Sequence, residues 1–115
     1  EFLLPYLYSE GVARGRIPVA RLVELLSTAP ARIFGLPHKG AVRVGFDADL
    51  VLFDPQAQVE VRAEEQYLPV GFNIFEGMTF TGRPRLTLSR GLIVIDNGQF
   101  VGRPGSGRFI ERKLS

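Results

Sequence analysis

The spacing of apolar residues changes once along this chain, near residue 40, and this change constrains the fold more than any other feature. Before it, apolar residues recur at the three- and four-residue spacing of a helix face, as at Val19, Leu22, Val23 and Leu26. After it, apolar residues run together or alternate as they do in β-strands. Helices that all precede the strands, instead of alternating with them, predict an α+β fold or two structural units that meet near residues 37–40.

Three short helices are expected in the first 36 residues. In the first, Gly11 and Gly15 loosen or end the helix. The second begins near Pro18, which suits a first helical turn, and the third is capped by Thr28 and stopped by Gly35. These helices are too short to bury their apolar faces against one another. We therefore expect them to pack against more polypeptide or against a second copy of the chain.

Five or six short strands are expected after residue 40. The apolar run at residues 50–53 predicts a strand buried on both faces and closed by Asp54-Pro55. The alternation at residues 59–62 predicts a strand with one wet face. Residues 82–84 are interpreted as a turn, and Asn97-Gly98 predicts a hairpin with a type I′ turn. Gly45 and Gly91 are interpreted as further tight turns.

Composition limits the classes of function. The chain has 115 residues, 45% of them apolar, and no cysteine, so disulfides and thiolate metal sites are excluded. No apolar run approaches the roughly 20 residues of a membrane helix. The net charge of +2 is too small for a strong case for nucleic-acid binding, although arginines and two phenylalanines interleave near the C-terminus. We expect a cytoplasmic protein with neither membrane nor nucleic-acid partners.

The search for chemical motifs predicts no catalytic, cofactor-binding or metal-ligating residue in this chain. His38 is the only histidine and falls in an expected loop, so it is interpreted as solvated. Glu64-Glu65 is interpreted as a solvated helix start, and Glu76 as a hydrogen-bonded structural carboxylate instead of a general acid or base.

Two further patterns fail as binding loops. Asp47-x-Asp49 resembles the start of a calcium loop but lacks the later glycine and glutamate, and Gln58 occupies the twelfth position. The spacing of Gly40 and Gly45 fits a phosphate loop whose Lys-Ser/Thr pair is replaced. The two aspartates are interpreted as turn residues that bind local amides and orient the chain into the strand at residue 50.

Several stretches together resemble the C-terminal end of dihydropyrimidinases and D-hydantoinases, which are cyclic amidohydrolases. The Gly-Phe-Asp-Ala-Asp segment at residues 45–49 and its flanks are shared by many amidohydrolases, including dihydroorotases and deacetylases. The resemblance to dihydropyrimidinases and D-hydantoinases in particular rests on two other stretches, Phe-Asn-Ile-Phe-Glu-Gly-Met at residues 72–78 and the Gly-rich end. The remaining similar stretches are residues 31–36, 82–84, 89–91 and 105–110.

The resemblance implies a parent fold, a metal-dependent (β/α)₈ barrel joined to a composite β-sandwich. Residues 1–39 would be the last helices of the amidohydrolase barrel. Residues 40–102 would be the C-terminal part of the sandwich, and residues 103–115 an extended assembly tail. The partners implied are the missing N-terminal barrel portion and further copies in a homo-oligomer, a dimer or a tetramer.

The resemblance also implies ring-opening hydrolysis of a small cyclic amide, a dihydropyrimidine or a hydantoin. The family uses hydroxide held between two divalent metal ions, with zinc the expected metal. Its ligands are a His-x-His pair, a carboxylated lysine, two further histidines and an aspartate, and none of them matches a position here. The 115-residue chain alone is therefore predicted to be inactive.

Two alternatives remain open at the level of sequence. One is a non-catalytic scaffold, similar to the collapsin-response mediators, which keep this fold without a working metal site. Upstream histidines would separate it from the hydrolase. The other is a free-standing basic β-module that binds nucleic acid, which predicts a steep dependence of binding on salt.

Overall fold

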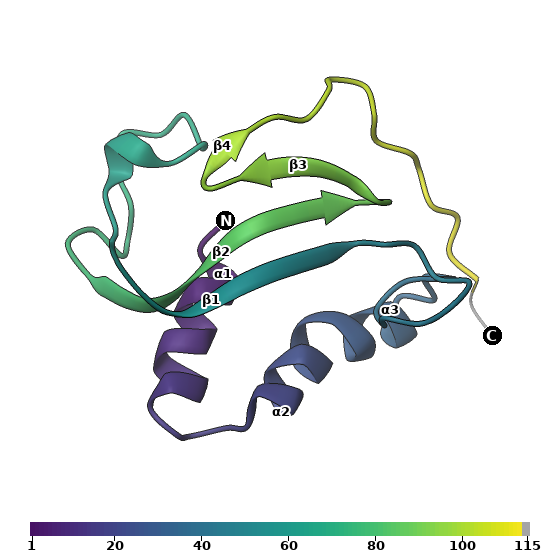
Figure 1. Ribbon diagram of the computed structural model, residues 1–115, viewed down its shortest axis with the longest axis horizontal. Helices are drawn as coiled ribbons and strands as arrows, with labels where there is room; N and C mark the ends of the chain where they lie inside the picture. Colours follow the sequence, from purple (N-terminus) through teal and green to yellow (C-terminus); the bar gives the residue numbers. More distant parts are fainter. Residues whose placement is uncertain (114–115) are drawn as a thin grey trace.

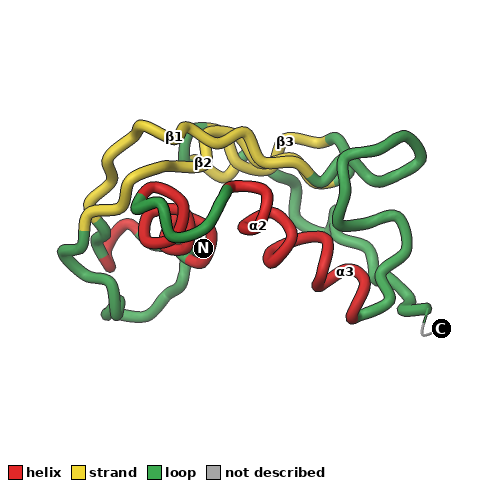
Figure 2. Tube along the Cα trace, turned by 90° about the horizontal axis from the view of Figure 1, so that it is seen from below, coloured by secondary structure: helices red, strands yellow, loops and turns green. Residues whose placement is uncertain are grey.

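Helices cover one face of an antiparallel sheet, so the chain folds as two layers (Figures 1 and 2). The structure is a computed structural model that describes residues 1–113. The expected α+β fold is confirmed. The last two residues of the proposed assembly tail, Leu114 and Ser115, lie outside the described residues.

The helical part forms two continuous runs instead of the three helices expected. The first run joins α1 (Leu3–Leu7) to the π-helical segment η1 (Tyr8–Ala13), which contains the loosening Gly11. The second joins α2 (Val19–Val23), the π-helical segment η2 (Glu24–Thr28) and α3 (Ala29–Ile33). A single 3₁₀ turn, η3 (Ala63–Glu65), lies among the strands of the described chain.

The ends of these runs agree with the sequence in part. Gly15 and Gly35 adopt positive φ where the two runs end, as expected of helix stops. Pro18 directly precedes α2 with extended backbone. The cap predicted at Thr28 is wrong, because the backbone there is already helical. Its hydroxyl instead donates to the Gly40 carbonyl at 2.9 Å and ties the helix to the following segment.

Four strands form one sheet in the described residues, in the order β1-β2-β3-β4. They are β1 (Leu50–Glu60), β2 (Thr79–Ser89), β3 (Leu92–Asp96) and β4 (Gln99–Phe100), and neighbours are antiparallel. The hairpin turns place Arg90-Gly91 and Asn97-Gly98 at positive φ. Because both central residues have positive φ, the type I′ turn predicted at Asn97-Gly98 is confirmed.

The strand ends predicted at Pro55 and at residues 82–84 are wrong, because the two long strands continue through β-bulges there. The pairing of β1 with β2 shifts between Leu52 and Phe53 and again between Asp54 and Gln58. Pro55 and the predicted turn at residues 82–84 therefore lie within strands, where a bulge tolerates proline and glycine. The expected five or six strands reduce to four.

The prediction that residues 50–53 are buried on both faces is also wrong for the described residues. β1 lies at the edge of the sheet, with β2 on one side. The side chains of Val51 and Leu52 are 45% and 54% exposed. An apolar run at a sheet edge is exposed when no further strand or layer covers it.

The first helical run packs on the sheet through a cluster of aromatic rings. Tyr6 stacks on Phe75 at 4.9 Å between ring centroids and meets the edge of Phe80 at 5.8 Å. The ring of Tyr8 contacts that of Phe53, with 4.6 Å between the ring centroids. Ser9 is buried, and its hydroxyl accepts the Thr81 N–H at 3.0 Å. This cluster joins residues 1–13 to β1 and β2 as one body.

The second helical run leaves much of its apolar surface uncovered. Leu22 and Ala31 are buried and Leu26 is half-buried, whereas most of the other large apolar side chains of the run remain open to solvent in the described structure. These exposed side chains are Val19, Val23, Leu25 and Ile33, followed by Phe34 at the end of the run. A surface of this kind normally packs against other polypeptide.

Substituting Gly82 should weaken the contact between the first helical run and the sheet. Gly82 has φ +97°, and a Cβ there would lie 2.5 Å from Tyr8 and 2.6 Å from Phe53. We expect Gly82→Ala to lower the free energy of unfolding by about 3 kcal/mol, from overpacking and backbone strain together. Urea unfolding followed by circular dichroism measures this loss.

Gly91 supplies the matched control, since its φ is also positive but nothing lies within 4 Å of its Cβ position. Gly91→Ala should cost about 1 kcal/mol, from backbone strain alone. Equal losses for the two variants would contradict the packing role of Gly82.

Candidate functional site

The single histidine of the sequence lies on an exposed loop. His38 is exposed, with its ring edge-on to Phe46 at 5.9 Å, so its interpretation as a solvated side chain is confirmed. Across residues 1–113 no three His, Cys, Asp or Glu side chains come close enough to hold a metal ion. The same residues contain no helix that is long and apolar enough to cross a membrane.

A cluster of charged residues joins the helical part to the sheet. Lys39 extends its ammonium to Asp49 and to Asp47, the latter at 3.0 Å. The second oxygen of Asp49 accepts the Arg90 N–H at 2.8 Å, in the turn between β2 and β3. The aspartates were expected to bind local amides, but the Asp49 carboxylate binds across 41 residues of sequence. We name these four residues the Lys39 network.

The Lys39 network shifts two pKa values. Burial alone would lower the pKa of Lys39, but hydrogen bonds to Asp49 and Asp47 outweigh it and raise that pKa. Burial alone would raise the pKa of Asp49, but the bonds from Lys39 and from the Arg90 N–H lower it. Both groups are thus held in their charged forms at neutral pH, which is typical of a structural ion pair.

A second ion pair lies where β1 meets β2. The Arg85 guanidinium donates to Asp54 at 3.1 Å and to the Asn97 side chain at 3.2 Å. The Gln56 N–H and then Arg85 lower the pKa of Asp54. The pair therefore fixes the bulged part of β1 against the β3–β4 hairpin.

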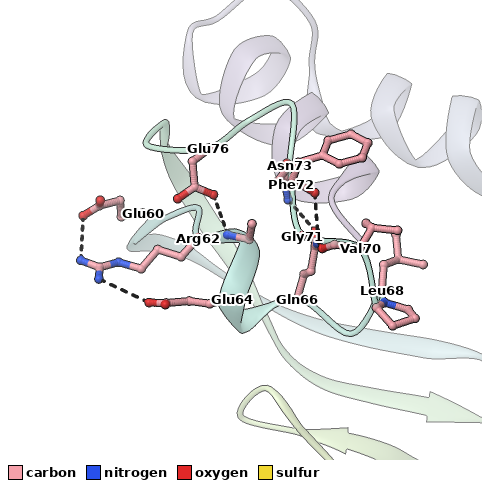
Figure 3. Close-up of a pocket in the computed structure, with 12 residues that line it drawn as sticks. Glu60, Arg62, Glu64, Gln66, Leu68, Val70, Gly71, Phe72, Asn73 and Glu76 are labelled. Carbon is pink, nitrogen blue, oxygen red and sulfur yellow. Dashed lines mark hydrogen bonds and ion pairs between the residues drawn. The ribbon is translucent and has the colours of Figure 1, made fainter.

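A hollow with a volume of about 900 Å³ is lined mainly by the loop between β1 and β2 (Figure 3). Glu60 and Glu64 lie 3.6 and 3.9 Å from Arg62 on one side of it. Leu68, Val70 and Phe72 line the other side, but neither Leu68 nor Val70 was singled out by the sequence analysis.

Side-chain hydrogen bonds fix the shape of this loop. Gln66 donates to the carbonyls of Val70 and Phe72 at 2.7 and 3.1 Å, and accepts from Asn73 at 3.0 Å. Glu76 accepts the Ala63 N–H at 2.6 Å, so its interpretation as a structural carboxylate is confirmed. Gln66 and Asn73 were missed. Only the tendency of asparagine to bind an amide two residues ahead, here at 2.8 Å, could have indicated Asn73.

The loop is also attached to the start of the first helical run. Both carboxylate oxygens of Glu1 accept the Tyr67 N–H, at 3.2 and 3.1 Å. The ring of Phe75 packs against the rings of Tyr6 and Phe2, and its centroid lies 6.3 Å from that of Phe2. Tyr67 donates its hydroxyl to the Gly98 carbonyl at 2.5 Å. Residues 66–78, which we call the anchored loop, thus connect the helix start to the β3–β4 turn.

The family model described as the amidohydrolase family matches residues 2–94. The chain therefore belongs to the amidohydrolase family.

Individual relatives make the similarity more specific. The chain is 48% identical over 107 residues to a D-hydantoinase from Geobacillus stearothermophilus, covering 92% of this chain and 23% of that protein. It is 43% identical over 108 residues to a dihydropyrimidinase from Rattus norvegicus, covering 93% and 21%. A solved D-hydantoinase (dihydropyrimidinase) from Thermus sp. matches with a TM-score of 0.93 at 41% identity, covering 97% and 25%. The chain thus spans a quarter or less of the length of these relatives.

Removing Asp49 should destabilise the fold more than removing Asp47. Asp49 bonds both Lys39 and the Arg90 N–H, whereas Asp47 pairs through its side chain with Lys39. We expect Asp49→Ala to lower the free energy of unfolding by about 1 kcal/mol and Asp47→Ala by less than about 0.5 kcal/mol. An unchanged melting temperature for Asp49→Ala would count against the network.

Acid should remove the contribution of Asp49. Because its pKa is lower in the folded state, the unfolded chain takes up this proton first as the pH falls. The contribution is present above the ordinary aspartate pKa of about 3.9 and is lost as the pH falls through the lower folded value. Unfolding of the wild type and Asp49→Asn should therefore differ at neutral pH and converge in acid. A constant difference would contradict this assignment.

Proposed function

We propose that this chain is the C-terminal portion of a metal-dependent hydrolase that opens cyclic amide rings of the hydantoin or dihydropyrimidine type. The observation that carries the proposal is a match over more than nine-tenths of the chain to hydantoinases of which it spans only about a quarter. In this proposal the portion supplies structure and assembly contacts, and the remainder supplies the catalytic residues.

The exposed apolar side of the second helical run supports the proposed domain arrangement. Residues 1–39 form the last helices of a (β/α)₈ barrel, and side chains such as Val23 and Ile33 pack against the barrel portion outside this chain. Residues 40–102 form the C-terminal part of a composite sandwich, completed by strands or layers over exposed Val51 and Leu52. Residues 103–115 act as an assembly tail.

The residues described here do not fit a centre of two divalent metal ions. Histidine ligands are needed to fix such a site, and His38 lies exposed on a loop. Asp47 and Asp49 are paired with Lys39, and Asp54 with Arg85. The metal ions, with zinc expected and a carboxylated lysine among their ligands, belong to the remainder of the parent enzyme.

The proposed parent acts in the cytoplasm as a dimer or tetramer. Exposed apolar residues on the tail and sheet, including Phe100 and Phe109, support contact with further polypeptide. A hydrolase of a small cyclic amide needs neither a membrane nor a nucleic acid.

A chimera tests the proposal. Residues 1–115 replace the matching quarter of the Geobacillus stearothermophilus D-hydantoinase, and ring opening of 5-phenylhydantoin is measured. We expect kcat/KM within about tenfold of the unaltered enzyme, because tenfold corresponds to only about 1.4 kcal/mol of transition-state stabilisation. A soluble, metal-loaded chimera without activity would overturn the proposal.

Two controls show which part supplies the chemistry. The 115-residue chain alone, supplied with zinc, should hydrolyse neither hydantoin nor dihydrouracil. The D-hydantoinase without its matching quarter should also be inactive. Hydrolysis by the 115 residues alone would contradict the predicted division of roles. The full-length protein that carries these residues, purified and assayed in the same way, separates a hydrolase from a non-catalytic scaffold.

A further inference from the structure

The anchored loop lies against the N-terminal end of the first helical run. Glu1 receives the Tyr67 N–H with both carboxylate oxygens, and Phe75 packs on Phe2 and Tyr6. These contacts join residues more than 60 positions apart in sequence. They fix a loop of the sheet layer to the start of a helix in the other layer.

In a (β/α)₈ barrel, the N-terminal ends of the helices lie on the face that carries the active site. Each barrel helix follows a loop from the carboxyl end of a strand, and these loops build the active site. If the first helical run is a barrel helix, as the proposed function holds, its N-terminal end lies on the catalytic face. The anchored loop then lies on that face as well.

The anchored loop presents apolar side chains from a fixed backbone. Leu68, Val70 and Phe72 are 58%, 45% and 69% exposed, although all three line the hollow. Gln66 holds the carbonyls of two of these residues. A backbone held in this way binds a ligand with little further loss of conformational entropy.

The charged side chains of the hollow lie apart from its apolar side. Figure 3 shows Arg62 directed toward Glu60 and Glu64, away from Leu68 and Val70. The carboxylate of Glu76 receives the Ala63 N–H. The side formed by Leu68, Val70 and Phe72 therefore suits an apolar group better than an ion.

We propose that the anchored loop forms part of the substrate-site wall and that Leu68, Val70 and Phe72 contact the ring substituent of the cyclic amide. This inference rests on the proposed function. It assigns the loop a role in specificity and none in bond cleavage. The substrate class is a cyclic amide with an aromatic or branched aliphatic substituent, preferred over the unsubstituted ring.

The test compares two substrates in the chimera described above. Phe72→Ala should lower kcat/KM for 5-phenylhydantoin by about tenfold, the scale at which an apolar pocket discriminates. It should leave kcat/KM for unsubstituted hydantoin within about twofold, because that ring lacks the contacted group. Phe72→Tyr, which keeps an aromatic ring, should retain the preference for 5-phenylhydantoin.

Ile74→Ala provides the matched control, since Ile74 is an exposed residue of the same loop outside the lining of the hollow. It should leave the ratio of the two kcat/KM values unchanged. An equal loss on both substrates in Phe72→Ala, or no loss, overturns the specificity role while the proposed function stands. If the chimera without any point substitution is soluble and metal-loaded but inactive, both the specificity role and the proposed function are overturned.

Discussion

The packing of the first helical run on β2 is the contact on which the rest of the structure depends. Buried Ser9 accepts the Thr81 N–H, so the helix satisfies a backbone group of the sheet directly. Next to this bond, Gly82 has no side chain, and the rings of Tyr8 and Phe53 occupy the space where one would lie. Without this close approach, the aromatic cluster around Phe80 could not form, and the two layers would lose the core that they share.

Features set by local residues were predicted well from the sequence. Asn97-Gly98 and Gly35 need only positive φ at a turn or helix end, and the structure has it at these positions. The predictions failed where distant residues decide the outcome. Thr28 is suited to a helix cap, but its hydroxyl binds Gly40 within a continuous helix. Residues 82–84 are typical of a turn, but pairing with β1 holds them within a strand.

The same distinction applies to the candidate site. The composition alone limits the metal chemistry open to the chain, because one histidine and no cysteine leave few ligands for a metal. The anchored loop was not predictable, because its contact with Glu1 joins residues 66 positions apart. Similarly, Asp49 was correctly singled out, but its bond to Arg90 depends on how the β2–β3 turn folds back on the chain.

The arrangement of charges supports the proposed role of this chain as a structural portion of a hydrolase. A catalytic group needs a charge or proton that its surroundings leave available, often with a pKa moved toward neutrality. Here Lys39 and Asp49 stabilise each other's charged forms, and their pKa values move away from neutrality. Asp54 is likewise held ionised by Gln56 and Arg85. Ion pairs of this kind fix loops and turns in place, and the proposed role in specificity depends instead on the position and apolar character of the anchored loop.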